Sequence, residues 1–188
     1  GDYSKFYIEG EQEYSAIDYT IESDWSAAAT LMVAAVIGGE VTVQNISTLS
    51  RQADTAICRA LERAGASIII EQNAITVAHR ALEAFSFDAT QCPDLFPAIV
   101  ALAAAASGVS TIYGIKRLRG KESDRGEALK EEYSKLGIAI ELDYDEDVMR
   151  VVGGNVKRAE VDSHDDHRIA MSLAITGLRL EEELSIRN

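Results

Sequence analysis

The stretch PDLFPAIVALAAAASGVSTIYGI, residues 93–115, decides the fold because it has two counterparts elsewhere in the chain. It consists of an Asp, an Ala-rich apolar run and a short β-type run. The same plan recurs in SDWSAAATLMVAAVIGGEVTVQNI from Ser23 and in DHRIAMSLAITGLRLEEELSI from Asp166. Asp24, Asp94 and Asp166 are separated by 70 and 72 positions. A fixed period of this length indicates a repeat architecture.

Each apolar run predicts a buried helix. Asp is a preferred N-cap, because its carboxylate accepts hydrogen bonds from the unpaired N–H groups of the first helical turn. The runs are apolar on nearly every side, which is typical of helices packed inside a protein. Short β-type runs follow the helices at residues 41–43, 111–113 and 184–186.

The second half of the unit also repeats. The stretches ICRALERAGASIIIEQNAITVA and ALKEEYSKLGIAIELDYDEDVMRVV both predict an amphipathic helix, a Gly stop, a strand, a tight turn and a strand. Gly65 and Gly137 are the expected helix-ending glycines, because glycine readily takes the left-handed conformation found there. The unit is therefore α/β, with the order helix, strand, helix, strand, strand.

The repeat sets the expected domain organisation. We expect one domain over residues 1–188, with units at approximately 1–22 (partial), 23–92, 93–164 and 165–188 (partial). Residues 5–22 match the strand pair before Asp94, and the last unit stops without its second helix. We therefore expect the chain to be an incomplete piece of a longer protein.

Composition excludes several classes of function. The net charge of -13 argues against a general nucleic-acid or anionic-membrane binder, because such proteins carry an excess of Lys and Arg. Cys58 and Cys92 form no CxxC or Cys/His cluster, so neither a zinc site nor a disulfide framework is predicted. The apolar run 98–106 is too short for a membrane span, which needs about 20 residues. No signal-peptide pattern is present, and we expect a soluble, cytoplasmic protein.

A local cluster of cations interrupts this acidic chain in and around LRGKESDRG, residues 118–126. Residues 116–125 hold five basic and two acidic side chains, a local balance of +3. One interpretation is a solvated charge run entering a helix, with Ser123 or Asp124 as its cap. The other is a loop that binds a charged substrate, since Arg matches carboxylates and phosphates with a planar fork and Lys supplies a point charge.

Three motifs together resemble the 5-enolpyruvylshikimate-3-phosphate synthase family: CPDLFPAIVALAAA at Cys92, LRGKESDRGEALKEEYSKLGI at Leu118 and DHRIAMSLAI at Asp166. Enzymes of this family transfer enolpyruvyl from phosphoenolpyruvate to the 5-hydroxyl of shikimate 3-phosphate, in chorismate and aromatic amino acid biosynthesis. The resemblance spans nearly the whole chain. It implies an inside-out α/β barrel-like domain, with parallel helices buried and sheets outside.

The resemblance also implies what the chain works with. The partners are phosphoenolpyruvate, shikimate 3-phosphate and an N-terminal domain of the same protein that is absent here, as is the final C-terminal segment. The activity is that of a carboxyvinyltransferase without metal or organic cofactor. We expect a monomeric full-length enzyme and no turnover by this chain alone.

The family's roles fall on six residues of this sequence. The resemblance implies that Asp94 accepts the proton of the attacking hydroxyl and that Glu122 donates a proton to the enol methylene. Lys121 would act at the reacting hydroxyl and bind shikimate 3-phosphate. The expected substrate-binding residues are Asp94, Lys121, Arg125, His167 and Arg168, with Arg125 and Arg168 on phosphoenolpyruvate.

Structural interpretations of the same residues stay open. Asp94 also fits an N-cap, and one carboxylate oxygen could cap while the other faces substrate. Asp24 and Asp166 are expected to cap and nothing more, and Ser123 and Asp124 are expected to be structural. His167 could orient its neighbours instead of touching substrate. HDDH, residues 164–167, invites a metal interpretation, but no further ligand cluster supports it and we predict no metal site.

Arg117 departs from the family pattern, which places Asn or an acidic residue there, so no substrate contact is carried over to it. Two other functions compete with the synthase. One is the sister enolpyruvyl transferase that acts on UDP-N-acetylglucosamine. The other is a non-catalytic α/β repeat module that binds a protein partner through its acidic surface.

Overall fold

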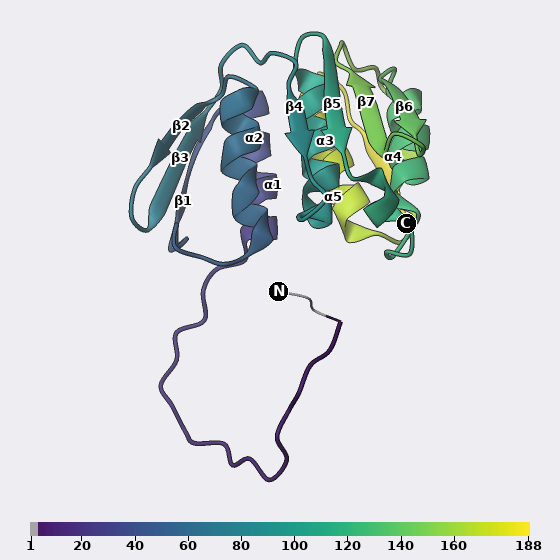
Figure 1. Ribbon diagram of the computed structural model, residues 1–188. Coiled ribbons are helices and arrows are strands. Elements are labelled where there is room, and N and C mark those ends of the chain that lie inside the picture. The colour runs from purple at the N-terminus through teal and green to yellow at the C-terminus, as the bar shows by residue number, and fades with distance from the viewer. Residues whose placement is uncertain (1–3) are drawn as a thin grey trace.

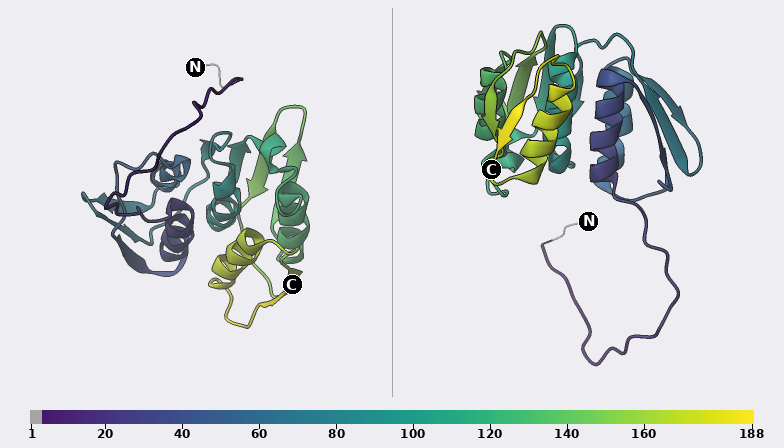
Figure 2. Two further views of the ribbon diagram at one scale, coloured as in Figure 1. Left: turned by 90° about the horizontal axis from the view of Figure 1, so that it is seen from below. Right: turned by 180° about the vertical axis from the view of Figure 1, so that it is seen from behind.

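The computed structural model describes residues 4–188 and places three helices side by side in the interior (Figure 1, Figure 2). These are α1 (Trp25–Gly38), α3 (Phe96–Ala105) and α5 (His167–Gly177). Each of the three contacts the other two. The Ala-rich runs therefore form the buried helices that the repeat predicts.

Small and branched apolar side chains allow this close packing. Every residue of α3 except Ala105 is buried, and Met32 and Val33 of α1 and Leu173 of α5 are fully enclosed. Burying a side chain of this kind contributes about 1.5–3 kcal/mol. In residues 4–188, no helix combines the length and the apolar character needed to cross a membrane.

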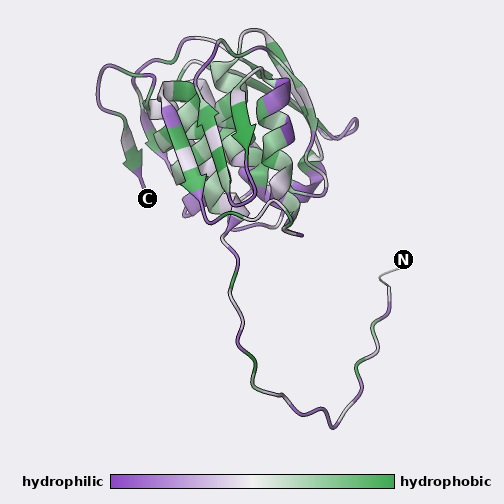
Figure 3. Ribbon diagram, turned by 90° about the vertical axis from the view of Figure 1, so that its left-hand side faces the viewer, coloured by the Kyte–Doolittle hydropathy of each residue, from purple (hydrophilic) through white to green (hydrophobic). Residues whose placement is uncertain are grey.

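The sheets cover the outside of these helices. The first has the order β1-β3-β2 and is antiparallel; it contains β1 (Glu40–Gln44), β2 (Ser67–Ile70) and β3 (Ala74–Ala78). Figure 3 faces this sheet and shows hydrophobic and hydrophilic residues in bands along its strands.

The second sheet has the order β4-β5-β7-β6. Its strands are β4 (Ser86–Asp88), β5 (Val109–Tyr113), β6 (Ala139–Asp143) and β7 (Val148–Val152). β4 pairs with β5 in parallel, and the other pairs are antiparallel. A third, parallel pair joins β8 (Glu160–Asp162) to β9 (Ser185–Arg187). Each predicted β-type run after an Ala-rich helix is thus a strand.

The second helix of the two complete units is also where the sequence predicts it. These helices are α2 (Ile57–Arg63) and α4 (Arg125–Lys135). Gly65 and Gly137 follow them with φ of 83° and 87°, the left-handed geometry expected of a helix-ending glycine. Both predictions are confirmed.

The prediction of a strand pair in residues 5–22 is wrong. Within residues 4–24 the structure has no strand, and the segment runs as an extended chain away from the helices and sheets (Figure 1). Tyr7 and Ile8 are 82% and 86% exposed. A likeness to another strand pair in the sequence is not sufficient, because a strand also needs a neighbour for its backbone N–H and C=O groups. The equivalent segments β4 and β8 have such neighbours in β5 and β9.

The contact between β7 and α3 generates a prediction about two adjacent glycines. A Cβ added to Gly153 would collide with the carbonyl oxygen of Ala106 and lie 2.8 Å from that of Ala103, whereas a Cβ on Gly154 meets nothing within 4 Å. We expect Gly153→Ala to lower the free energy of unfolding by about 2 kcal/mol or more, because backbone must move to admit the methyl group. Gly154→Ala is the matched control, and urea denaturation of both variants is the measurement. Equal stability of the two variants would contradict this packing.

Candidate active site

The N-terminal ends of four helices meet at one end of the interior. Arg125, the first residue of α4, contacts Asp94, just before α3, and Asp166, the N-cap of α5. The start of α1 lies beside the same 3-10 turn, Pro93–Leu95, that holds Asp94. Helix N-termini carry partial positive charge and unpaired N–H groups, so their convergence favours anions.

Arg125 is the centre of this region, and its side chain is completely buried. Its Nε donates to Oδ2 of Asp166 at 2.7 Å, and Nη2 lies 3.3 Å from Oδ1 of the same carboxylate. Nη1 donates to Oδ1 of Asp94 at 2.8 Å, and Nη2 to Oε2 of Glu122 at 2.7 Å. Three carboxylates therefore share all three guanidinium nitrogens.

Asp166 is the buried partner in this group. Its side chain is 0% exposed, and it accepts hydrogen bonds from Ser123 Oγ at 3.2 Å and from the backbone N–H of Arg168 at 3.0 Å. Burial raises the pKa of Asp166, but the hydrogen bond and charge of Arg125 and the bond from the Arg168 N–H outweigh it and hold the pKa below its ordinary value. Asp166 is therefore ionised at neutral pH, as a buried arginine requires.

Asp94 lies among three basic side chains. Lys121 Nζ lies 3.1 Å from its Oδ1, Arg125 Nη1 lies 2.8 Å from the same oxygen, and Arg168 Nη2 lies 3.7 Å from Oδ2. Partial burial raises the pKa of Asp94, yet the hydrogen bond from Lys121, the charge of Arg168 and the hydrogen bond from Arg125 hold it below its usual range. Asp94 is 37% exposed, so these cations surround a carboxylate that a ligand can reach.

The KESDR motif divides between ligand-accessible and structural side chains. Lys121 and Glu122 are 28% and 48% exposed and lie at the rim of the site. Ser123 donates to Asp166, and Asp124 caps α4 by accepting from the Glu127 N–H at 3.4 Å. The structural prediction for Ser123 and Asp124 is confirmed.

The other three cations of the cluster lie outside this group. Lys116 and Arg117 are exposed on the 3-10 turn Ile115–Leu118, and Arg119 stacks 4.1 Å from the ring centroid of Tyr144. None of them contacts the Asp94 carboxylate. Only part of the basic cluster in residues 116–125 therefore lies in the site. The position of Arg117 gives no support for a substrate contact.

Two sequence predictions about N-caps need correction. Asp94 does not cap α3, because it lies inside the 3-10 turn, and Leu95 holds the N-cap position without a side-chain bond. Asp166 caps α5 but also binds Arg125 and Ser123, so the prediction that it only caps is wrong. Asp24 does what was expected and accepts from the Ser26 N–H at 2.8 Å.

The two neighbours of Asp166 differ in their surroundings. Arg168 is partly buried, with 19% of its side chain exposed, and faces Asp94. His167 is exposed at the start of α5, and its ring makes no hydrogen bond or ion pair with residues 4–188. Arg168 thus joins the charged group, whereas His167 stands beside it with both ring nitrogens open.

One buried acid of this region is not marked by any sequence pattern. Asp54 is 8% exposed, accepts a hydrogen bond from Ser26 Oγ and lies close enough to Asp94 and Arg168 to interact electrostatically. Burial is the main cause of a raised pKa for Asp54, and the Asp94 charge adds to it against the Ser26 bond. The stretch QADTA contains no motif by which a buried Asp54 could be distinguished from a surface Asp in the sequence.

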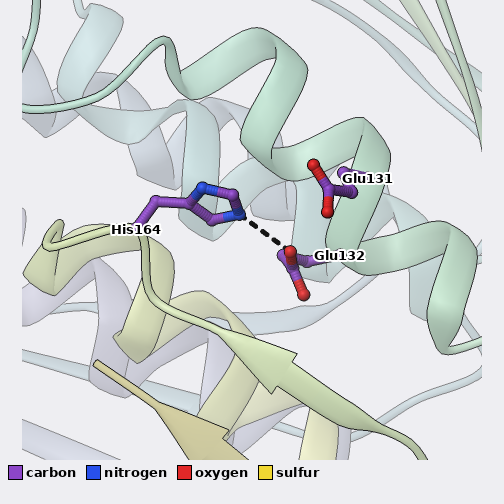
Figure 4. A group of neighbouring side chains, drawn as sticks. All are labelled: Glu131, Glu132 and His164. Carbon is purple, nitrogen blue, oxygen red and sulfur yellow. Dashed lines mark hydrogen bonds and ion pairs between the residues drawn. The ribbon is translucent and has the colours of Figure 1, made fainter.

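A possible metal-ligand group lies between the last turns of α4 and the turn before α5 (Figure 4). Glu131, Glu132 and His164 each offer a ligand atom within 4.8 Å of the others. Lys135 Nζ lies 2.7 Å from Glu132 Oε1 and 3.1 Å from Glu131 Oε1, so an ammonium group already supplies the positive charge. His164 is part of HDDH, but Asp165, Asp166 and His167 are outside the group. It does not fit a metal site.

Repeated α/β units around buried helices, with cations and carboxylates gathered at the helix N-termini, place the chain in the α/β class. The chain belongs to the EPSP synthase (3-phosphoshikimate 1-carboxyvinyltransferase) family, whose model matches residues 1–188. The inside-out α/β architecture expected from the resemblance is therefore supported by family as well as by fold.

Individual relatives agree with this assignment. The chain is 43% identical over 180 residues to the 3-phosphoshikimate 1-carboxyvinyltransferase of Methanosarcina acetivorans, covering 93% of this chain and 41% of that protein. For the Brachyspira hyodysenteriae protein of the same name, identity is 41% over 185 residues, covering 95% and 43%. EPSP synthase from Acinetobacter baumannii superposes with a TM-score of 0.79 at 29% identity, covering 88% of this chain and 42% of that one. The chain spans less than half the length of these relatives.

The two acidic N-caps generate a prediction about stability. We expect Asp166→Asn to lower the free energy of unfolding by about 3 kcal/mol at neutral pH, because it leaves the buried Arg125 with a neutral partner. Asp24→Asn is the matched control and should stay within about 0.5 kcal/mol, because Asn caps as well as Asp.

The pH dependence follows from the lowered pKa of Asp166. A carboxyl with a lowered folded pKa stabilises the fold above its unfolded pKa, and this contribution is lost as pH falls through the folded value. The difference between wild type and Asp166→Asn should therefore shrink below about pH 4. Denaturation across this range measures it, and a difference that persists unchanged in acid would argue against an ionised Asp166.

Proposed function

We propose that the whole protein transfers the enolpyruvyl group of phosphoenolpyruvate to the 5-hydroxyl of shikimate 3-phosphate and releases phosphate. The observation that carries this proposal is the meeting of KESDR and DHR at Asp94, where Lys121, Arg125 and Arg168 surround one carboxylate. Membership of the EPSP synthase family supports the choice of reaction.

The substrates together carry phosphate and carboxylate groups, and the site offers cations to match them. Lys121 and Arg168 are partly exposed and at present pair with Asp94. An arriving phosphate or carboxylate competes with Asp94 for these two side chains, because charge-assisted bonds to Lys and Arg are strong. Binding thereby reduces the positive charge that surrounds the Asp94 carboxylate.

This competition prepares Asp94 to act as the base. In the unliganded site its pKa is held low, and a strongly stabilised carboxylate is a poor proton acceptor. When substrate anions draw off Lys121 and Arg168, the pKa of Asp94 rises toward a more useful value. Asp94 then accepts the proton of the 5-hydroxyl while the oxygen of that hydroxyl forms a bond to C2 of phosphoenolpyruvate.

Glu122 is the proposed donor of the proton to C3 of phosphoenolpyruvate. It is 48% exposed, and its Oε2 lies 2.7 Å from Arg125 Nη2. A substrate anion that takes the same guanidinium nitrogen displaces the Glu122 carboxyl, which is then free to reach C3 of phosphoenolpyruvate. The resulting tetrahedral adduct then returns a C3 proton to Glu122, and its C2–O bond to phosphate breaks as the phosphate takes the proton from Asp94, which gives the enol ether and restores both carboxyl groups.

Arg125 contributes to binding through part of its guanidinium. Its Nε faces the buried Asp166, whereas Nη1 and Nη2 face the partly exposed Asp94 and Glu122. We assign phosphoenolpyruvate binding to the Nη edge and to Arg168. His167, with its open ring, lies within the same motif and completes the proposed binding set.

The chain provides one part of a site in this proposal. It spans 41% of the Methanosarcina acetivorans relative, and the remaining length of such proteins is available for a second domain that closes over the charged surface. Sites between domains are common for small substrates. A site shared between two domains predicts no turnover by residues 1–188 alone. We also propose that the full-length enzyme is monomeric and cytoplasmic.

The test is an assay of the full-length protein with phosphoenolpyruvate and either shikimate 3-phosphate or UDP-N-acetylglucosamine. We expect phosphate release with the first acceptor alone. Asp94→Asn should lower kcat by about 100-fold or more, the usual contribution of a general base. Asp24→Asn, at the equivalent place in the first unit, should leave kcat unchanged.

Three results would speak against the proposal. Product with UDP-N-acetylglucosamine would favour the sister transferase. Full activity of Asp94→Asn would remove the base from this chain. Turnover by the 188-residue chain alone would contradict a site shared with another domain.

A further inference from the structure

The turn between β8 and α5, residues 162–166, is tied to α4 at two points. The carboxylate of Glu132 accepts from the backbone N–H of Asp162 at 2.9 Å through Oε2. Its Oε1 lies 2.8 Å from Nε2 of His164 (Figure 4). The Glu132 side chain is 0% exposed, so both bonds are sheltered from water. One buried carboxylate therefore joins two elements that are far apart in the sequence.

The tied turn has an unusual backbone. His164 and Asp165 are consecutive non-glycine residues in the left-handed region, with φ of 53° and 55°. Such conformations are disfavoured for non-glycine residues and persist where the surroundings enforce them. The His164 N–H donates to Oδ1 of Asp162 at 2.7 Å, and the Asp166 N–H donates to the carbonyl of Ser163 at 3.0 Å. These bonds and the Glu132 contacts together hold the turn.

Lys135 keeps Glu132 available as an acceptor. Its Nζ lies 2.7 Å from Oε1 and 2.9 Å from Oε2 of Glu132. Burial raises the pKa of Glu132, but the hydrogen bonds from Lys135, the Asp162 N–H and His164 outweigh it, so the pKa is lowered. Glu132 is thus a carboxylate at neutral pH and accepts from both points of the turn.

The turn positions Asp166. The N-cap of α5 follows directly on the two left-handed residues, and its carboxylate holds Arg125 Nε at 2.7 Å. It also accepts from the Arg168 N–H at 3.0 Å. A shift of the turn would therefore move Asp166, and with it both arginines that face Asp94.

We propose that Glu132 and His164 are positioning residues, which fix the turn 162–166 and thereby set the places of Asp166, Arg125 and Arg168. This inference rests on the proposed function for its kinetic consequence. Neither side chain reaches Asp94 or the cations around it, so neither is catalytic. Glu132 affects the site only by holding the turn.

The experiment compares Glu132→Gln with Glu131→Gln in the full-length protein. Glu131 is the neighbouring residue of α4, pairs with the same Lys135 and makes no hydrogen bond or ion pair with residues 162–166, so it is a matched control. We expect Glu132→Gln to lower kcat/KM for phosphoenolpyruvate by about 10- to 100-fold, as small misplacements of reacting groups do. Glu131→Gln should change it by less than about twofold.

A second variant and a second measurement separate positioning from loss of fold. In His164→Asn the side chain is too short to bond Glu132, but Asn readily takes the left-handed backbone conformation. This variant should therefore keep the fold and still lower kcat/KM. Hydrogen exchange at Arg125 Nε–H, followed by NMR, should speed up at least about tenfold in Glu132→Gln and His164→Asn and stay unchanged in Glu131→Gln, because the buried bond to Asp166 loosens.

Unchanged kinetics and unchanged Arg125 exchange in both turn variants would overturn the proposal. Equal loss in Glu131→Gln would overturn it as well, since the effect would then belong to Lys135. The exchange measurement needs no turnover. If the protein makes no product from phosphoenolpyruvate while Arg125 exchange responds as expected, the positioning role stands and the proposed function fails.

Discussion

The pairing of Arg125 with Asp166 is the interaction on which the site depends. Arg125 is wholly buried, and an isolated guanidinium would be far too costly there. Asp166 supplies a buried countercharge through Nε and leaves the Nη edge to Asp94 and Glu122. The pair also joins the first residue of α4 to the N-cap of α5, so helix packing and site geometry share one contact. A change that disturbs either helix therefore reaches the cations.

Exposure separates the charged residues by what they can do. Asp166 and Glu132 are fully enclosed and hold other groups in place, whereas Asp94 and Glu122 are 37% and 48% exposed and face the surface. In this structure, cations of the site pair with these two carboxylates. In the proposed reaction, substrate anions exchange partners with them, so that substrate binding also changes the proton affinity of Asp94.

The sequence predicted the parts of the fold that depend on period and local propensity. The Ala-rich helices, the strands after them and the glycines at 65 and 137 follow from the 70-residue repeat. The position of Asp94 could not be predicted from the repeat. Pro93–Leu95 forms a 3-10 turn, so Asp94 does not take the N-cap position that Asp24 and Asp166 hold in their units. Glu132 is paired across 32 positions with His164, and no periodicity on α4 reveals such a partner. The match of residues 5–22 to the strand pair before Asp94 likewise does not provide a neighbouring strand.

The central claim is that Asp94 is ionised and held by three basic side chains, and that substrate draws two of them, Lys121 and Arg168, away from it. Its most direct test is an NMR titration of the Asp94 carboxyl carbon, with and without saturating phosphoenolpyruvate and shikimate 3-phosphate. The account predicts a pKa below the ordinary value of about 3.9 in the free protein and a higher pKa in the complex. An ordinary or raised pKa without ligand, or one that does not rise on binding, would contradict it.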